Sequence, residues 1–217
     1  TPTNTIGNHI ALYTNGGVER GKSYDANQMN ISAYSSIEFK IDDKIKSVIG
    51  LRAENFVQKY TGENSGGTVK YDDEKVIDKL DIFPSTNFIY SLKENSNLRL
   101  SYSKTTARPS FKEVSIAEIY DPLSNMTFNG NINLKPSYID NLDLRYELFG
   151  EDNELFAISG FYKSFKDPIE LTYYEASTEN FQPKNLGNAK VYGLELELRK
   201  QISQSLGINL NASIIES

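Results

Sequence analysis

Residues 140–149 read DNLDLRYELF and alternate between apolar and polar side chains over most of their length. The even positions from 142 to 148 hold Leu, Leu, Tyr and Leu, whereas the odd positions from 143 to 147 hold Asp, Arg and Glu. Successive side chains of a β-strand point to opposite faces. The stretch therefore predicts a strand with one apolar face and one charged face.

Seven further segments have strand-like periodicity, so we predict eight strands in all. They span residues 29–41, 45–58, 82–93, 97–105, 140–149, 154–165, 188–200 and 205–215. The gaps 42–44, 94–96, 150–153 and 201–204 are short, whereas 59–81, 106–139 and 166–187 are long and mostly polar. Short turns at one end and long loops at the other are typical of a transmembrane β-barrel. We therefore expect the four short turns to lie together, opposite the three loops.

Strand length agrees with a membrane span, because a tilted strand needs about 9 to 11 residues to cross a bilayer. A soluble antiparallel sandwich also alternates apolar and polar residues. Sandwiches, however, rarely alternate tight turns with such long loops so regularly. The pattern predicts an all-β fold, an antiparallel meander of about eight strands.

Composition excludes several classes of protein. The 29 acidic and 23 basic residues give a net charge of −6, which argues against a nucleic-acid-binding surface. The absence of cysteine excludes disulfides and thiolate metal sites. The mean hydropathy of −0.49 is compatible with a barrel, since only every second strand residue faces lipid. Tyr and Phe gather near strand ends, as aromatic girdles or ordinary β-propensity would place them.

Five motifs occur in order at strand or loop positions. They are GLRAE at 50–54, YSKTTARPSF at 102–111, GNINLKPSYIDN at 130–141, GFYKSFKDPIE at 160–170 and NLGNAKVYGLELE at 185–197. Together they resemble the barrel of TonB-dependent outer-membrane receptors, particularly those of Bacteroidetes-like bacteria. The resemblance covers residues 24–217.

This resemblance implies that residues 1–217 are a partial receptor barrel from a larger one of about 22 strands. The role of residues 1–23 is uncertain, and the plug and remaining strands are expected to be absent. The implied protein lies in the cell outer membrane among its lipid and is not an enzyme. It imports a scarce ligand (siderophore, glycan, cobalamin or peptide) using energy from the TonB complex, transmitted through the plug. No cofactor and no nucleic-acid partner are implied.

Candidate ligand contacts come from the long loops, because exposed loops on a rigid scaffold usually carry recognition. They are Tyr60, Tyr71, Arg108, Tyr120, Phe128, Tyr173, Tyr174 and Phe181. The charged strand face supplies the residues expected to line the lumen and to pair across neighbouring strands. They are Arg52, Glu54, Arg145, Glu147, Glu195, Glu197 and Arg199. We predict no catalytic residue and no metal site, because no carboxylate pair is set apart in pKa and the lone His9 has no second ligand nearby.

Two other functions remain open. The chain could be a complete eight-stranded barrel that acts as an anchor or adhesin, or a secreted β-sandwich that binds glycans. Because the resemblance implies further strands, we predict an open sheet with no ladder between residues 29–41 and 205–215.

We also predict which leucines face lipid, opposite the charged lumen face. They are Leu142, Leu144, Leu148, Leu194, Leu196 and Leu198.

Overall fold

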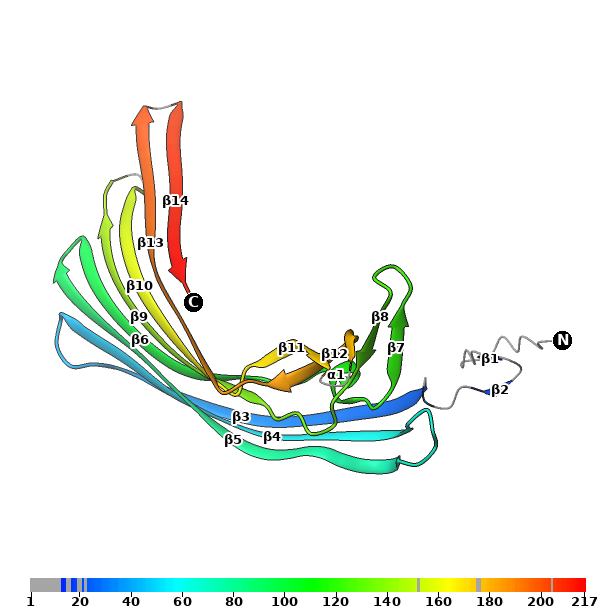
Figure 1. The fold of residues 1–217 in the computed structure, drawn as a ribbon. Coiled ribbons are helices and arrows are strands. Elements are labelled where there is room, and N and C mark those ends of the chain that lie inside the picture. The colour runs from blue at the N-terminus through cyan, green and yellow to red at the C-terminus, as the bar shows by residue number, and fades with distance from the viewer. Residues whose placement is uncertain are drawn as a thin grey trace.

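A computed structural model describes residues 13–14, 17–18, 21, 23–151, 153–174, 177–203 and 205–217. Its dominant feature is one curved eight-stranded antiparallel sheet (Figure 1). Its strands are β3 Tyr24–Lys40, β4 Ile45–Glu63, β5 Lys70–Lys93, β6 Ser96–Ala107, β9 Ser137–Phe149, β10 Leu155–Lys166, β13 Asn188–Ser203 and β14 Leu206–Glu216. A separate short pair consists of β1 Tyr13–Thr14 and β2 Gly17–Val18. The predicted all-β meander is confirmed.

The eight-stranded sheet is open. Its strands follow the order β14-β13-β10-β9-β6-β5-β4-β3, so β3 and β14 form its two edges. We call this curved eight-stranded sheet the wall. Figure 1 shows β3 and β14 on opposite sides of it. The predicted absence of a ladder between the first and last strands is confirmed within the described residues, which disfavours a closed eight-stranded barrel.

The short turns gather at one end of the sheet. The Ser91 backbone N–H donates to the Lys44 carbonyl at 2.8 Å, and the Phe149 N–H donates to the Asn95 carbonyl at 2.8 Å. These bonds join neighbouring turns, since each crosses from one hairpin to the next. The predicted common end for the short turns is confirmed.

The first predicted loop, 59–81, is mostly paired strand, so that prediction is wrong. β4 continues to Glu63 and β5 begins at Lys70, leaving a turn at 64–69. Two register shifts interrupt the pairing, between Gln58 and Lys59 and between Tyr60 and Gly62. Polar residues dominate both faces of this extension. Apolar alternation, the signal used to recognise strands, is therefore missing there.

The other two long loops build a second sheet together. Residues 106–139 contain α1 Phe111–Val114, β7 Glu118–Asp121 and β8 Met126–Asn129, and residues 166–187 contain β11 Ile169–Tyr174 and β12 Ser177–Asn185. The order is β11-β12-β8-β7, and β12 pairs with β8 in parallel. We call this four-stranded unit the loop sheet. It lies on the concave side of the main sheet (Figure 1).

The tightest core lies between the loop segments and the concave face of β4. A capping box starts α1, because the Ser110 side chain accepts from the Glu113 N–H while the Glu113 carboxylate accepts from the Ser110 N–H. Val114 at the end of α1 is buried, as are Phe56 and Tyr60 on β4. The Ile116 backbone N–H, two residues after Val114, donates to the Tyr60 hydroxyl, so the loop segment lies against the wall here.

The register of the strands aligns similar residues from strand to strand, so the sheet has two chemically distinct faces. Glu54 on β4 is opposite Asp81 on β5. Every second residue of β5, counted from Asp81, points to the same face, and one of these residues is opposite Arg99 on β6. Arg99 is in turn opposite Arg145 on β9. These residues share the concave face. The predicted lipid-facing leucines have the opposite parity on β9 and β13, and four of them are among the exposed hydrophobic residues: Leu142, Leu144, Leu148 and Leu194.

Candidate functional site on the concave face

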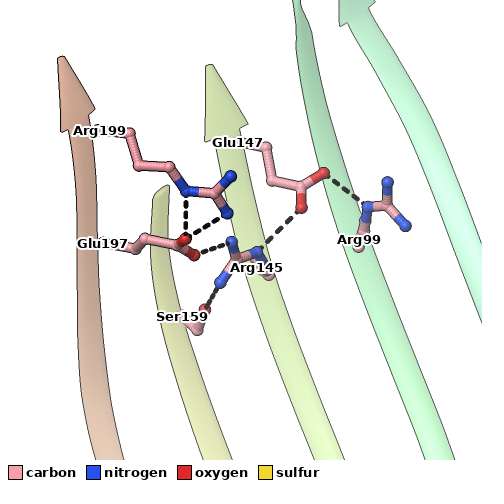
Figure 2. Close-up of polar contacts among 6 residues, drawn as sticks. All are labelled: Arg99, Arg145, Glu147, Ser159, Glu197 and Arg199. Carbon is pink, nitrogen blue, oxygen red and sulfur yellow. Dashed lines mark hydrogen bonds and ion pairs between the residues drawn. The ribbon is translucent and has the colours of Figure 1, made fainter. Parts of the chain in front are cut away.

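A chain of ion pairs crosses the concave face near the short turns (Figure 2). Glu147 on β9 accepts from two arginines, Arg99 Nε at 2.6 Å and Arg145 Nε at 2.9 Å. Glu147 itself is buried. Two guanidinium groups on one buried carboxylate keep it fully paired, which is the condition under which a charge is tolerated away from water.

Arg145 extends the chain to β13, two strands away. Its Nη2 lies 2.8 Å from Glu197 Oε2, and its Nη1 donates to the Ser159 hydroxyl at 3.0 Å. Glu197 also pairs with Arg199 at 2.6 Å. Between Glu147 and Glu197 on β10 lies Ala157, which is opposite both in register. The small alanine leaves room for the arginine to pass.

We expect Ala157→Leu to lower the free energy of unfolding by about 1 to 3 kcal/mol, the usual cost of overpacking a filled site. Ala157 is completely buried, so the larger side chain has no open space to enter. Ala157→Ser is the matched control and should change stability little. Denaturant unfolding of the intact protein measures both variants. Equal stability of Ala157→Leu and wild type would contradict a close-packed path for Arg145.

A second polar cluster lies at the other end of the wall, under the loops. Arg108 Nη2 is 2.7 Å from Glu54 Oε2 and 3.6 Å from Asp81 Oδ2. Its guanidinium carbon lies 4.3 Å from the ring centroid of Phe56. The Tyr138 hydroxyl donates to Asp81 Oδ1 at 2.7 Å. The Arg108 side chain is 16% exposed and each carboxylate side chain 10%. Arg108 therefore links the loop at residues 106–139 to β4 and β5.

Two further hydrogen bonds fasten the same loop. The Gln58 amide Nε2 donates to the Pro109 carbonyl at 3.3 Å, and the Ile116 backbone N–H donates to the Tyr60 hydroxyl at 3.2 Å. Gln58 and Tyr60 have exposed fractions of 0% and 1%. Their burial shows that this contact excludes water.

The loop sheet brings three predicted aromatic residues into one cross-strand row. Tyr173 is opposite Phe181, and Phe181 is opposite Phe128. The rings of Tyr173 and Phe181 are stacked with centroids 5.2 Å apart. Lys112 Nζ lies 4.5 Å from the Phe128 centroid, within the range of a cation–π contact. Tyr173 is 61% exposed. We call Lys112, Phe128, Tyr173 and Phe181 the aromatic row.

Other candidate contacts lie outside this row. Tyr60 was expected in an exposed loop, but it is buried on β4 and makes an edge contact with Tyr71 on β5, with centroids 6.1 Å apart. Arg108 is occupied by the wall carboxylates. Tyr174 ends β11, and its side chain lies outside the described residues. The ligand-contact role of all eight candidates stays a prediction.

Tyr120 sits on the β7–β8 hairpin, where its neighbours form an ordered turn. Its hydroxyl donates to Asn125 Oδ1 at 2.9 Å. The backbone N–H of Leu123 and the hydroxyl of Ser124 donate to the Asp121 carboxylate and hold its pKa below the usual range. The turn of the hairpin therefore carries the negative charge of Asp121 at neutral pH. Tyr120 on the same hairpin is exposed.

The seven predicted lumen residues lie on β4, β9 and β13 with the parity of the concave face. The second cluster adds Arg52, whose Nε is 2.5 Å from Glu54 Oε1. Glu195 makes none of the ion pairs described above, and it lines a hollow beside Arg145. Whether this face lines a lumen stays a prediction.

Several residues of these clusters are not among the candidate residues predicted from the sequence. Arg99 alternates with Leu98 and Leu100, so the period-2 signal was sufficient to find it. Asp81 and Lys112 lie in segments that the sequence predicts as loops, and these segments have no periodic pattern.

Within the described residues, no group of His, Cys, Asp and Glu has the arrangement of a metal site. No helix in that part of the chain is long and apolar enough to cross a membrane.

Three solved structures share the fold with sequence identities below 20%. The siderophore receptor PirA from Pseudomonas aeruginosa has a TM-score of 0.62 at 16% identity, over 88% of this chain and 43% of PirA. The FrpB iron transporter from Neisseria meningitidis has a TM-score of 0.63 at 17% identity, over 90% and 27%. The hemophore receptor HasR from Serratia marcescens has a TM-score of 0.71 at 14% identity, over 88% and 34%.

The chain thus spans less than half the length of each neighbour, and it matches their barrel portion. No curated protein gave a significant match. The likeness shows that this chain shares the fold of these barrels, so the barrel fold expected from the five motifs is confirmed. A family profile described as "Outer membrane protein beta-barrel family" matches residues 10–217 and places the protein in the cell outer membrane. By this match over almost its whole length, the chain belongs to the outer membrane protein beta-barrel family.

Proposed function

We propose that this chain is part of the wall and mouth of a TonB-coupled receptor that imports a scarce ligand across the outer membrane. The observation that carries the proposal is the aromatic row, held by the loop sheet at the end of the wall opposite the short turns. In barrels of this kind the short turns are periplasmic and the longer loops extracellular. The row then faces the medium from which a ligand would arrive.

Ligand chemistry follows from the side chains in the row. Stacked aromatic rings bind planar or apolar groups, and a lysine beside them favours an anion. The neighbours named above include receptors or transporters for a siderophore, iron and heme with its hemophore. We extend this to an anionic, partly planar iron chelate, such as a ferric siderophore or heme.

Passage inward would follow the concave face. Charged clusters lie at both of its ends, the Arg108 cluster under the loops and the Arg145 network near the turns. The predicted energy coupling requires a plug domain and an inner-membrane partner, and both belong to the proposal. Within it, the ion pairs hold the wall rigid while other parts move.

Uptake in cells tests this function. Cells with and without the intact protein are given radiolabelled ferric enterobactin, a second ferric siderophore or hemin under iron limitation, and each strain is tested with TonB active and inactivated. We expect accumulation of one probe to need both the protein and TonB. Accumulation of every probe without regard to either would refute the proposal.

Tyr173→Ala should weaken binding of the accumulated probe roughly tenfold, about 1.4 kcal/mol, because it removes an exposed stacked ring. Leu123→Ala is a matched control, since Leu123 is an exposed apolar residue at the hairpin tip of the same sheet. Titration of the probe onto intact cells measures both affinities. If both variants bind as wild type does, the row is not the contact surface.

Neither alternative function gains support from the fold. The small-barrel alternative requires β3 to pair with β14, whereas they are the edges of the described sheet. A sandwich requires a second sheet on the apolar face. In the described part of the chain, the second sheet lies instead on the concave, charged side.

A further inference from the structure

The loops at residues 106–139 and 166–187 share little main-chain pairing. In the described residues, β8 and β12 pair at only two positions, and the second is Phe128 opposite Phe181. Pro183 follows on β12, and proline has no N–H to donate to a ladder. Beyond these two pairs, three side-chain amides connect the loops. We call them the amide seam, which consists of Asn131, Gln182 and Asn185.

The first two amides of the seam bind backbone carbonyls of the opposite loop. Gln182 Nε2 donates to the Gly130 carbonyl at 3.3 Å, and Asn131 Nδ2 donates to the Pro183 carbonyl at 3.1 Å. A side chain at position 130 does not fit, because a Cβ there would lie 2.0 Å from the Ser115 carbonyl oxygen at the end of α1. The segment that follows β8 is therefore fixed between α1 and β12.

Asn185 makes the most complete contact of the seam. Its Oδ1 accepts from the Lys135 backbone N–H at 2.8 Å, and its Nδ2 donates to the Lys135 carbonyl at 3.0 Å and to the Asp167 carbonyl at 2.8 Å. A primary amide has two N–H donors, and both are used here. The side chain therefore binds Lys135 as the backbone of a neighbouring strand would, and it also holds the start of its own loop.

The β11–β12 hairpin continues the β10–β13 hairpin of the wall, with a bend between them. The β10–β13 ladder ends at Lys166, and the β11–β12 ladder starts at Ile169. Between the ladders, the Asp167 N–H donates to the Gly187 carbonyl at 2.8 Å, and these two residues have φ values of 55° and 42°. This left-handed conformation turns the chain, so β11 and β12 run onto the concave side (Figure 1). The Ser137 hydroxyl donates to the Asp167 carbonyl at 2.7 Å and holds the bend on the wall.

The bend and the amide seam together decide where the aromatic row lies. Tyr173 and Phe181 belong to the hairpin beyond the bend, whereas Phe128 belongs to the other loop. If the hairpin turned at the bend, the two parts of the row would separate. In the described part of the chain, the main-chain pairs and the amide seam resist this movement. Asn185 makes two of the bonds across the loops, more than either other amide of the seam.

We propose that Asn185 is the positioning residue of the aromatic row. It holds the β11–β12 hairpin against the base of the other long loop, so Tyr173 and Phe181 stay beside Phe128. A ligand that spans the row then meets both loops at once. The role of Asn185 in binding rests on the proposed function, whereas its coupling of the two loops does not.

Double electron–electron resonance on the intact protein tests the coupling. These 217 residues contain no cysteine, so spin labels can be attached after Leu123→Cys and Leu171→Cys, at one exposed position on each loop. With the amide seam intact, we expect one narrow distribution of label-to-label distances, because the two loops move together.

Two matched variants are compared in this labelled protein. Asn185→Asp keeps an acceptor for the Lys135 N–H, but it should broaden the distribution about twofold, since a carboxylate offers no N–H to the Lys135 and Asp167 carbonyls. Asn180→Asp adds the same charge to the same strand outside the amide seam and should keep the width of wild type. A distribution as narrow in Asn185→Asp as in wild type would overturn the proposal.

A double-variant titration tests the role in binding. The probe is whichever of ferric enterobactin, the second ferric siderophore and hemin accumulates in cells. Asn185→Asp should weaken its binding about tenfold, and adding Tyr173→Ala should weaken it little further, because both changes act through the same row. Loss of folded protein would lower the saturation level instead of the affinity. Losses that multiply in the double variant would reject positioning through the row. Wild-type cells that bind no probe would refute the proposed function and the binding role together, while the spin labels decide the coupling separately.

Discussion

Replacement of Arg108 by alanine should lower the free energy of unfolding by about 3 to 5 kcal/mol, because it removes one partner from a buried ionic cluster. Glu54 and Asp81 would keep their charges under the loops, although Glu54 would retain Arg52. The stacking of the guanidinium on Phe56 would be lost as well. The loop that begins after β6 should then detach from the wall.

Limited proteolysis and denaturant unfolding of the intact protein measure this effect. We expect faster cleavage within residues 106–139 and a lower unfolding midpoint. The triple variant Arg108→Met, Glu54→Gln, Asp81→Asn removes all three charges together and should recover much of the loss. A single Arg108→Ala variant as stable and as resistant as wild type would show that the cluster does not hold the loop.

Leu196→Arg should cost about 2 to 4 kcal/mol when the protein folds into lipid, because it places a charge near the middle of the lipid-facing band. Leu196 has the convex-face parity, in a row with Leu98, Tyr146 and Ile158. The adjacent Glu195 has the opposite parity and is exposed. Glu195→Gln should therefore change folding little.

Folding of each variant into vesicles, followed by denaturant titration, separates the two faces. The expected order is a large loss for Leu196→Arg and a loss below about 0.5 kcal/mol for Glu195→Gln, the usual range for a surface change. The reverse order would mean that the convex face is not the lipid face.

The wall could be predicted from the sequence because its signal is local. Apolar residues at every second position of β9, β13 and β14 fix the strands and the faces, and short polar gaps fix the hairpins. The strand ends, in contrast, differ from the predicted ones. β3 begins at Tyr24, before the expected residue 29, and β4 and β5 run well beyond the apolar band. Pairing outside the bilayer does not need apolar alternation, so periodicity cannot show it.

The candidate site was predictable in composition but not in arrangement. Phe128, Tyr173 and Phe181 were chosen as aromatic loop residues, and the structure places them in one row. Their meeting depends on a parallel pair between segments about fifty positions apart, which local pattern does not encode. Tyr60 was misplaced for a related reason: a loop that folds back over the wall buried it.

The parallel pairing of β8 with β12 also constrains how binding preference can diverge among relatives. Thr127 lies opposite Asn180, so each of the two long loops supplies a strand that the other needs. Transplanting residues 106–139 alone from a relative whose loop has no strand matching β8 would leave β12 paired only with β11 and expose the backbone groups on its other side. Chimaeras should keep the fold of this mouth only when both insertions come from the same parent, which makes the pair, rather than the single loop, the unit of exchange.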